Sequence, residues 1–303
     1  MKIVLYDPIT NLHKFFVNSI VLEFTKKLGN NSTIFLNKNI IENNNINKID
    51  FKNDIIILIF NPHFLKDNLE IKNDFQYICR NFKYKVLYIT EPINFIIEKN
   101  VYNLIIKQLN PICLMTYTFE NFHKINSINH KFIYRVLPIF NEAYNFCNIS
   151  FENIKKRSRD KIIFFGNINK NREYIHDIFK DKLINMNDKW SENEWKEIID
   201  ENIFYLNIHR RTNCKSFEAF RIIPILVNGG VIISENCNKL EEEEFEPYNI
   251  FFTKKENMFD LFTDLKLNYE NEEIYQKTIN IRQKLMNGNE LDKFIDLIKK
   301  MTL

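Results

Sequence analysis

The sequence predicts an α/β protein made of two Rossmann-like domains that face each other across a cleft. Short apolar runs of strand length alternate with longer amphipathic runs, which is typical of βαβ units around a buried parallel sheet. The alternation pauses once, at the polar and basic segment 147–160, and then restarts. We therefore predict a first domain over 1–155 and a second over 156–303; a single large α/β domain with a polar insertion is the alternative.

The first half contains six runs with the length and β-branched composition of strands. They are Lys2–Tyr6, Thr33–Leu36, Ile55–Phe60, Lys85–Thr90, Ile112–Tyr117 and Phe132–Leu137. Amphipathic segments between them predict helices over Leu12–Leu28, Asp74–Phe82 and Phe95–Leu109. This order predicts a parallel sheet with helices on both faces.

The second half repeats the pattern. Strands are predicted at Lys161–Phe165, Phe204–Ile208, Val231–Ser234 and Asn249–Phe252, and helices at Asn171–Phe179, Glu194–Asp200 and Cys214–Val227. The tail Glu256–Leu303 looks helical, with a break near Asn287–Gly288. We expect a kink at Pro224, which cannot donate the backbone hydrogen bond to Phe220.

The composition argues against several classes of protein. The chain of 303 residues is 45% hydrophobic and 27% charged, with a net charge of +3, so it lacks the basic surface typical of nucleic-acid binders. The five cysteines are scattered without CxxC spacing, which indicates reduced thiols rather than disulfides or zinc. We expect no nucleic-acid partner.

No targeting or membrane segment is expected either. The opening "MKIVLYDPIT" has no basic region followed by an apolar stretch and a cleavage site, so it does not resemble a signal peptide. The longest apolar runs, such as "IIILIF", are too short to span a bilayer. These features predict a cytoplasmic protein without an integral membrane segment.

Ligands of open α/β sheets bind beyond the carboxyl ends of the strands, so residues that directly follow strands are the candidates for a site. Gly166 and Asn167 follow one predicted strand, and Arg172 opens the next helix. Glycine permits close approach of the backbone to a ligand, and arginine suits a phosphate. An ordinary turn with a surface arginine is the alternative.

Two further groups lie near strand ends. His209 and Arg210 follow the strand 204–208, although a lone histidine is often structural. Glu218 and Arg221 are three residues apart, so they share one face of a helix, where they could simply form an ion pair.

The same helix leads to a pair of glycines, in a chain that has only five. Gly229 and Gly230 suit a helix end in the left-handed conformation, and the strand after them ends at Ser234 and Glu235. The pair predicts a backbone geometry that other residues do not satisfy.

Four segments together resemble the carboxyl-terminal half of GT-B glycosyltransferases of the family-1 and family-4-like group, which use nucleotide sugars. They are "KIIFFGNINKNREYI", "FYLNIHRR", "SFEAFRIIPILVNGGVIISE" and "YNIFFTKKENMFDLF". In that group an R-x-x-E-x-x-x-x-G type helix precedes a strand ending in Ser or Glu, and Arg221 and Gly229 have that spacing. The resemblance implies a donor-binding role for Gly166, Asn167, Arg172, His209, Arg210, Glu218, Arg221, Gly229, Gly230, Ser234 and Glu235.

Two positions depart from that pattern. Many relatives place a ribose-binding Glu three residues after the arginine, where this chain has Pro224. The residue eight positions beyond Glu218 is Leu226, so there is no E-x7-E pair. The resemblance implies transfer of a hexose from a UDP- or GDP-sugar to a hydroxyl acceptor such as a glycan. An inactive GT-B-like binding protein and a sugar-nucleotide epimerase are the alternatives.

The predicted reaction needs neither a metal nor a cofactor besides the nucleotide sugar. No D-x-D motif follows a strand, and the acidic run Glu241–Glu244 is interpreted as a solvated helix face. Arginines and helix termini would then neutralise the leaving pyrophosphate. The general base is expected in the first domain, where Asp7, His63 and Glu91 each follow a strand; the sequence does not choose among them.

Overall fold

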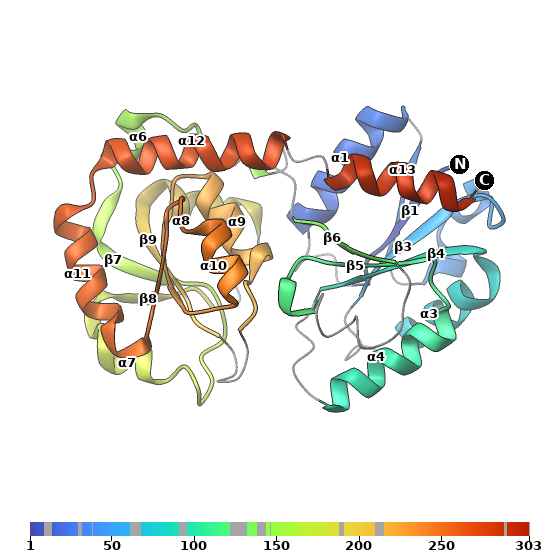
Figure 1. The fold of residues 1–303 in the computed structure, drawn as a ribbon, viewed down its shortest axis with the longest axis horizontal. Helices are drawn as coiled ribbons and strands as arrows, with labels where there is room; N and C mark the ends of the chain where they lie inside the picture. Colours follow the sequence, from blue (N-terminus) through green and yellow to red (C-terminus); the bar gives the residue numbers. More distant parts are fainter. Residues whose placement is uncertain are drawn as a thin grey trace. The chain divides into compact units, whose positions relative to one another are not determined.

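The computed structural model describes residues 1–8, 14–29, 32–37, 39–60, 68–90, 96–121, 132–137, 144–145, 147–187, 191–209, 215–287 and 290–302. The described residues form two parallel sheets, interleaved with helices, as predicted (Figure 1). The chain divides into two compact units. One consists of Met1–Leu137 with Gly288–Leu303, and the other of Pro138–Asn287.

The sheet of the first unit has the strand order β2-β1-β3-β4-β5-β6, and every neighbouring pair is parallel. Its strands are β1 (Ile3–Tyr6), β2 (Thr33–Leu36), β3 (Ile55–Phe60), β4 (Tyr84–Ile89), β5 (Cys113–Thr116) and β6 (Ile133–Arg135). All six predicted strands are confirmed. Their continuous apolar sequence follows from burial of both faces of the sheet.

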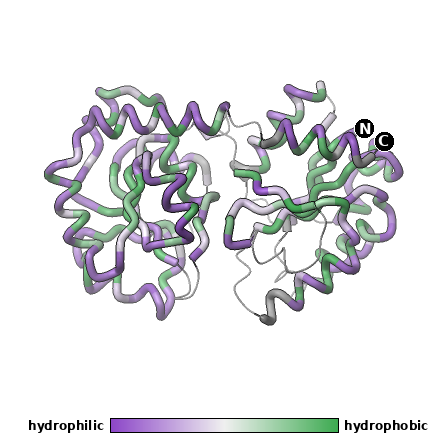
Figure 2. Tube along the Cα trace, viewed as in Figure 1, coloured by the Kyte–Doolittle hydropathy of each residue, from purple (hydrophilic) through white to green (hydrophobic). Residues whose placement is uncertain are grey.

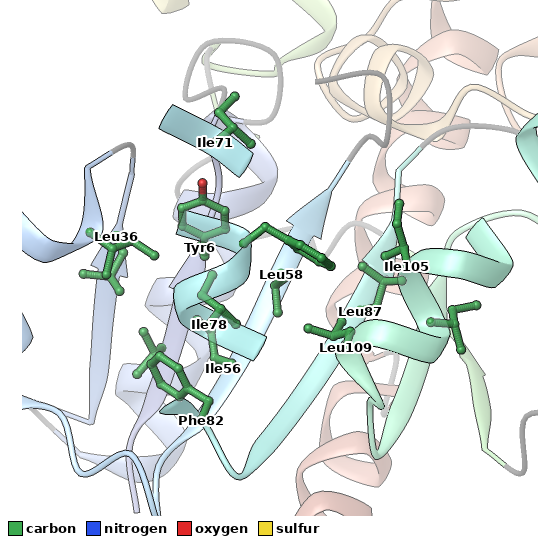
Figure 3. Close-up of a cluster of buried hydrophobic side chains, with 14 of the residues drawn as sticks. Tyr6, Leu36, Ile56, Leu58, Ile71, Ile78, Phe82, Leu87, Ile105 and Leu109 are labelled. Atoms are coloured by element: carbon green, nitrogen blue, oxygen red, sulfur yellow. The ribbon is translucent and has the colours of Figure 1, made fainter. Parts of the chain in front are cut away.

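Helices cover both faces of this sheet. They are α1 (Lys14–Leu28), α3 (Leu69–Asn81), α4 (Ile96–Leu109) and α13 (Glu290–Thr302), with short 3-10 turns at Ile40–Glu42 and Ile46–Lys48. Figure 1 shows α3 and α4 on one face and α1 and α13 on the other. Between the sheet and α3 and α4 lies a core that includes Leu58, Leu87, Ile78, Ile105 and Leu109 (Figure 3).

The last helix belongs to the first unit. Asp292 of α13 forms an ion pair with Lys27 of α1, and the Phe294 ring packs edge-on against Tyr134 with centroids 6.4 Å apart. The units therefore differ from the predicted ranges 1–155 and 156–303. The chain returns to the first unit after α12, because α13 has an apolar stripe that packs there.

The sheet of the second unit has the order β11-β10-β9-β7-β8, again all parallel. Its strands are β7 (Ser158–Phe164), β8 (Leu183–Asn185), β9 (Asn202–Asn207), β10 (Val231–Glu235) and β11 (Ile250–Thr253). The four predicted strands are confirmed. The three-residue edge strand β8 was not predicted, since its sequence is too short to show a period.

The helices of the second unit surround this sheet. They are α6 (Phe151–Lys155), α7 (Tyr174–Phe179), α8 (Glu192–Glu201), α9 (Ala219–Val227), α10 (Lys239–Phe245), α11 (Met258–Asn268) and α12 (Asn271–Asn287), with 3-10 turns at Lys180–Lys182 and Lys255–Asn257. α7 and α11 share a core with one face of the sheet, through Phe179 and Phe262. On the other face, Phe165 stacks on Trp195 of α8 at 4.2 Å between ring centroids.

Residues 147–160 do not form the linker predicted from their polarity. Ser150 caps α6 by accepting a hydrogen bond from the Asn153 amide at 3.1 Å, and Ile154 is fully buried. Arg157 donates to the Asn228 carbonyl at 2.7 Å, and β7 begins at the next residue. The segment is thus part of the second unit, because its few apolar and basic side chains are anchored there.

Hydropathy follows this architecture: in Figure 2 the strands are largely hydrophobic and the helices present hydrophilic faces. Among the described residues, no helix is both long and apolar enough to cross a membrane. Cys79, Cys113, Cys147 and Cys237 are free thiols.

Candidate functional site

Both sheets have a point where the direction of strand addition reverses. In the second unit, β8 lies on one side of β7 and β9 on the other. In such doubly wound sheets the ligand crevice opens at the carboxyl ends of the two strands that flank this reversal. Gly166 follows β7 and His209 follows β9, so two of the predicted residues lie at this position. We call the carboxyl ends of β7 and β9 the switch point.

Gly166 lets two arginines approach the switch point. Its φ of +149° is unfavourable for residues with a side chain. A Cβ added there would lie 3.3 Å from the Phe164 ring, 3.4 Å from Arg172 Nη1 and 3.6 Å from Arg221 Nη2. The backbone after β7 is therefore packed directly beside both guanidinium groups.

Arg172 joins the loops after β7 and β9. Its side chain lies in the turn before α7, is 4% exposed, and donates to the carbonyl oxygens of Ile208 at 2.6 Å, Asn167 at 2.9 Å and His209 at 3.4 Å. The guanidinium also lies over the Phe164 ring, 5.2 Å from its centroid. These bonds hold the two loops together, so the structure gives Arg172 a positioning role that its sequence context did not indicate.

Arg221 has unused hydrogen-bonding capacity. Its Nη2 forms an ion pair with Glu218 Oε2 at 2.7 Å, as the i,i+3 spacing predicts. Its Nε and Nη1 atoms are buried and donate no hydrogen bond within the described part of the chain. The other Glu218 oxygen lies 3.8 Å from Arg172 Nη2. The Glu218 carboxylate thus holds the Arg221 guanidinium, while two donor atoms of Arg221 remain available.

His209 is 6% exposed and is held at both its backbone and its ring. Its amide donates to Glu235 Oε2 at 2.5 Å, and its ring Nε2 lies 3.0 Å from the Asn236 carbonyl oxygen. Ring atom Nδ1 is buried and has no hydrogen-bond partner among the described residues.

Glu235, at the end of β10, has a carboxylate that is fully used within the protein. Besides the hydrogen bond from the His209 amide, it accepts a hydrogen bond from the Tyr174 hydroxyl at 3.4 Å and forms an ion pair with the Lys255 ammonium at 3.2 Å. Burial, and then the neighbouring Glu235 charge, raise the pKa of Tyr174. Ser234 accepts from Asn207 Nδ2 at 2.9 Å and donates to the Glu235 carbonyl at 2.8 Å. Ser234 and Glu235 therefore support the loop that presents His209.

The acidic run Glu241–Glu244 on α10 does not form the solvated face that we predicted. Glu241 is fully buried, and its carboxylate accepts a hydrogen bond from the Phe217 amide at 3.0 Å. Phe217 stacks on Phe245 with centroids 4.1 Å apart. Residue 217 directly precedes Glu218, so α10 fixes the start of α9. No pattern in the sequence distinguishes Glu241 from the less buried glutamates that follow it.

Gly229 and Gly230 do not join this group. They lie before β10, at the amino edge of the sheet, whereas the switch point lies at the carboxyl edge. Gly229 has φ of +81°, and the bonds from Gly229 N to Leu226 O at 3.2 Å and from Gly230 N to Ile225 O at 3.0 Å form a Schellman motif. A Cβ on Gly230 would lie only 2.3 Å from Ile225 Cγ2. The double glycine thus forms the helix end, at the edge of the sheet opposite the switch point.

In the first unit, Asp7 follows β1, which is the reversal strand of its sheet. Asp7 is buried, and its amide donates to the Leu36 carbonyl at 3.2 Å. The Tyr6 hydroxyl donates to Asp74 at 3.1 Å, and burial is the first cause that raises the pKa of each of these two groups. His63, Glu91 and Arg210 lie outside the described residues.

Lys255 and Tyr174 were missed at the site. Lys255 lies two residues after β11, so the rule that selected His209 would also have found it. Tyr174 is the first residue of α7 and carries no such signal. Within the ranges that the structure describes, no group of three or more His, Cys, Asp or Glu side chains is arranged to hold a metal ion.

No protein-family model matches the chain, and no curated protein matches its sequence. Solved structures match over the whole chain. HepE of Anabaena in complex with UDP and glucose has a TM-score of 0.62 at 8% identity, covering 100% of this chain and 99% of that one. An α-glucosyltransferase in complex with UDP-glucose and abasic DNA has a TM-score of 0.67 at 8% identity, covering 99% of each chain.

The lipopolysaccharide glycosyltransferase WaaG also matches, with a TM-score of 0.52 at 7% identity over 98% of this chain and 99% of that one. At these identities the likeness shows the fold and not the activity. The chain has the GT-B glycosyltransferase fold, with two parallel-sheet units, as the resemblance of the sequence implied.

Proposed function

We propose that the protein is a glycosyltransferase that takes a hexose from a nucleotide sugar, with the donor diphosphate bound at the switch point of the second unit. The observation that carries this proposal is Arg221. Two of its buried donor atoms have no hydrogen-bond partner among the described residues, and it lies beside Gly166. A phosphate oxygen would accept from these atoms in a charge-assisted hydrogen bond.

The chemistry of sugar transfer fits this position. Departure of a nucleoside diphosphate develops negative charge on the phosphate, and a fixed guanidinium stabilises that charge without a metal ion. Glu218 keeps Arg221 in one orientation, which lowers the entropy lost on binding. Because neighbours of this fold bind UDP-glucose, a UDP-sugar is our first choice of donor, before a GDP-sugar.

On the acceptor side we propose Asp7 as the general base for a hydroxyl acceptor such as a glycan. It is the described candidate at the reversal strand of the first sheet, and a carboxylate can remove the proton from an attacking hydroxyl. His63 and Glu91 remain alternatives. Asp7→Asn should abolish turnover while leaving the binding of UDP unchanged.

Calorimetric titration with UDP and UDP-glucose tests the donor site. We expect Arg221→Ala to weaken binding about ten- to a hundredfold, because a hydrogen bond to a charged group contributes about 1.5–3 kcal/mol. Arg159→Ala is the matched control, since Arg159 bonds to Asn271 and the Lys266 carbonyl at the amino end of β7. Equal affinity in all three proteins would contradict the proposal. Turnover in EDTA tests the proposed independence from metal.

A binding protein without catalysis is the second candidate. Helix α9 favours this candidate. Pro224 and Leu226 stand where the glycosyltransferases that the sequence resembles carry glutamates, and both residues are buried. Such a protein would bind UDP-glucose, and Arg221→Ala would weaken this binding as it would in an active enzyme. It would neither hydrolyse the donor slowly nor transfer the sugar when hydroxyl acceptors are supplied.

A further inference from the structure

We infer that His209 accepts a hydrogen bond from a hydroxyl group of the bound nucleotide sugar, through the lone pair of its Nδ1 atom. This inference rests on the proposed function and adds to it a specific contact. The phosphate requires donors from the protein, which Arg221 supplies. The hydroxyls of ribose and sugar can instead donate, and a site for them needs acceptors.

The hydrogen bonds of His209 fix its tautomer. The Asn236 carbonyl oxygen, 3.0 Å from Nε2, can only accept, so Nε2 carries a proton. A charged imidazolium would also place a proton on Nδ1, which is buried without an acceptor among the described residues. In the neutral ring Nδ1 is therefore an acceptor atom.

A second acceptor lies two residues earlier in the chain, at Asn207, the last residue of β9. The Ser234 hydroxyl donates its one proton to the Glu235 carbonyl, so it must accept from the Asn207 side chain, which orients Nδ2 toward Ser234. Asn207 Oδ1 is then turned away, buried, and without a hydrogen-bond partner within the described ranges. The last residue of β9 and the second residue after this strand thus each carry a buried acceptor atom without a partner in the described part of the chain, Asn207 Oδ1 and His209 Nδ1.

The protein holds His209 rigidly enough to discriminate between ligands with and without a matching hydroxyl. Glu235 receives its amide, Arg172 donates to its carbonyl, and Asn236 fixes its ring. A buried acceptor that is satisfied only by the ligand penalises any ligand without the matching hydroxyl. Such a geometry selects for a polyhydroxylated ligand over a bare pyrophosphate.

Two substitutions separate the role of Nδ1 from that of Nε2. The amide nitrogen of His209→Gln can replace the Nε2 donor to Asn236, but it leaves no acceptor at Nδ1. The amide oxygen of His209→Asn can replace the Nδ1 acceptor. Melting temperatures of both variants report whether either one disturbs the fold.

We expect His209→Gln to weaken UDP-glucose binding about tenfold, while His209→Asn stays within about threefold of the wild type. Competition by inorganic pyrophosphate should be unchanged in both. A loss seen with UDP-glucose but not with UDP identifies a sugar hydroxyl, and a loss with both identifies a ribose hydroxyl; either supports the inference.

Three results would overturn the inference. His209→Gln could bind UDP-glucose with wild-type affinity, or the two variants could lose affinity equally. Weaker competition by pyrophosphate would show instead that His209 contacts phosphate. If these results came with a clear loss in Arg221→Ala, the proposed function would stand and only the role of His209 would fall. A wild-type protein that binds neither UDP nor UDP-glucose would overturn both.

Discussion

The two ends of helix α9 differ in how their buried polar groups are satisfied. At the carboxyl end, the Asn228 side chain donates to the Tyr144 and Pro224 carbonyls at 2.6 and 2.8 Å and accepts from the Cys147 amide at 3.2 Å. At the amino end, Arg221 keeps two buried donor atoms without hydrogen bonds in the described part of the chain. The polar groups of the Asn228 side chain are satisfied within the chain, whereas at the amino end the proposed diphosphate would supply the missing acceptors.

Unused donors alone do not identify a site. Arg157 also has buried Nε and Nη2 atoms without hydrogen bonds among the described residues, although Nη2 lies 3.9 Å from Asp200. Arg157, however, lies at the amino edge of the sheet beside Gly229, where doubly wound folds do not bind ligands. The position of an arginine relative to the strand ends, more than its hydrogen-bond count, distinguishes Arg221 from Arg157.

The largest expected effect is on stability at the glycine end. We expect Gly230→Ala to lower the free energy of unfolding by about 3 kcal/mol, because its Cβ would overlap Ile225 and approach Tyr205 to 2.9 Å. Gly29→Ala is the control: Gly29 has a positive φ, unlike Gly230, but open space around it, so it should lose only about 1 kcal/mol. Denaturant melts measure both. Equal losses would show that Ile225 and Tyr205 move aside for a Cβ, and that packing does not require glycine at 230.

Asn228→Ala should have the next largest effect. It removes three buried hydrogen bonds, to the Cys147 amide and to the Tyr144 and Pro224 carbonyls, which costs about 2–3 kcal/mol of folding free energy. Asn153→Ala removes an exposed bond to the Asn148 carbonyl and should cost about 0.5 kcal/mol or less. UDP affinity should be unchanged in both variants. A loss of affinity in Asn228→Ala would show that the two ends of α9 are coupled.

The sequence predicted most of the fold and many of the residues that the structure brings to the switch point, for physical reasons. The predicted strands are long apolar runs whose burial on both faces leaves a clear signal, and Glu218 and Arg221 meet because helix geometry dictates it. Gly229 and Gly230 were assigned to the site because a glycine signals unusual backbone geometry without saying what lies beside it. Glu241 was missed because its burial depends on contacts with Phe217, 24 positions earlier in the chain.

At the amino end, Arg172→Lys separates positioning from phosphate binding. Lysine cannot donate to three carbonyls in a plane, so we expect a loss of about 1–2 kcal/mol in stability. Affinity for UDP should fall less than in Arg221→Ala when both are measured well below their melting temperatures. An intact melting curve together with a tenfold loss of affinity would instead make Arg172 a direct phosphate ligand.

The smallest expected effect is that of Glu218→Gln, and it decides what this carboxylate does. Its Oε2 is occupied by Arg221 at 2.7 Å, and the side chain is 19% exposed, so an ion pair of this kind contributes only a few tenths of a kcal/mol, that is about 0.2–0.5. The substitution also removes a negative charge near the proposed diphosphate, which partly offsets the looser hold on Arg221. We therefore expect UDP affinity to change by less than about threefold and uridine affinity to stay the same. A carboxylate that bound the ribose would behave differently, because its loss would weaken UDP and uridine equally, by about tenfold. Titration of the variant with both ligands, beside Arg221→Ala as the reference for a phosphate contact, distinguishes a residue that orients an arginine from one that touches the nucleoside.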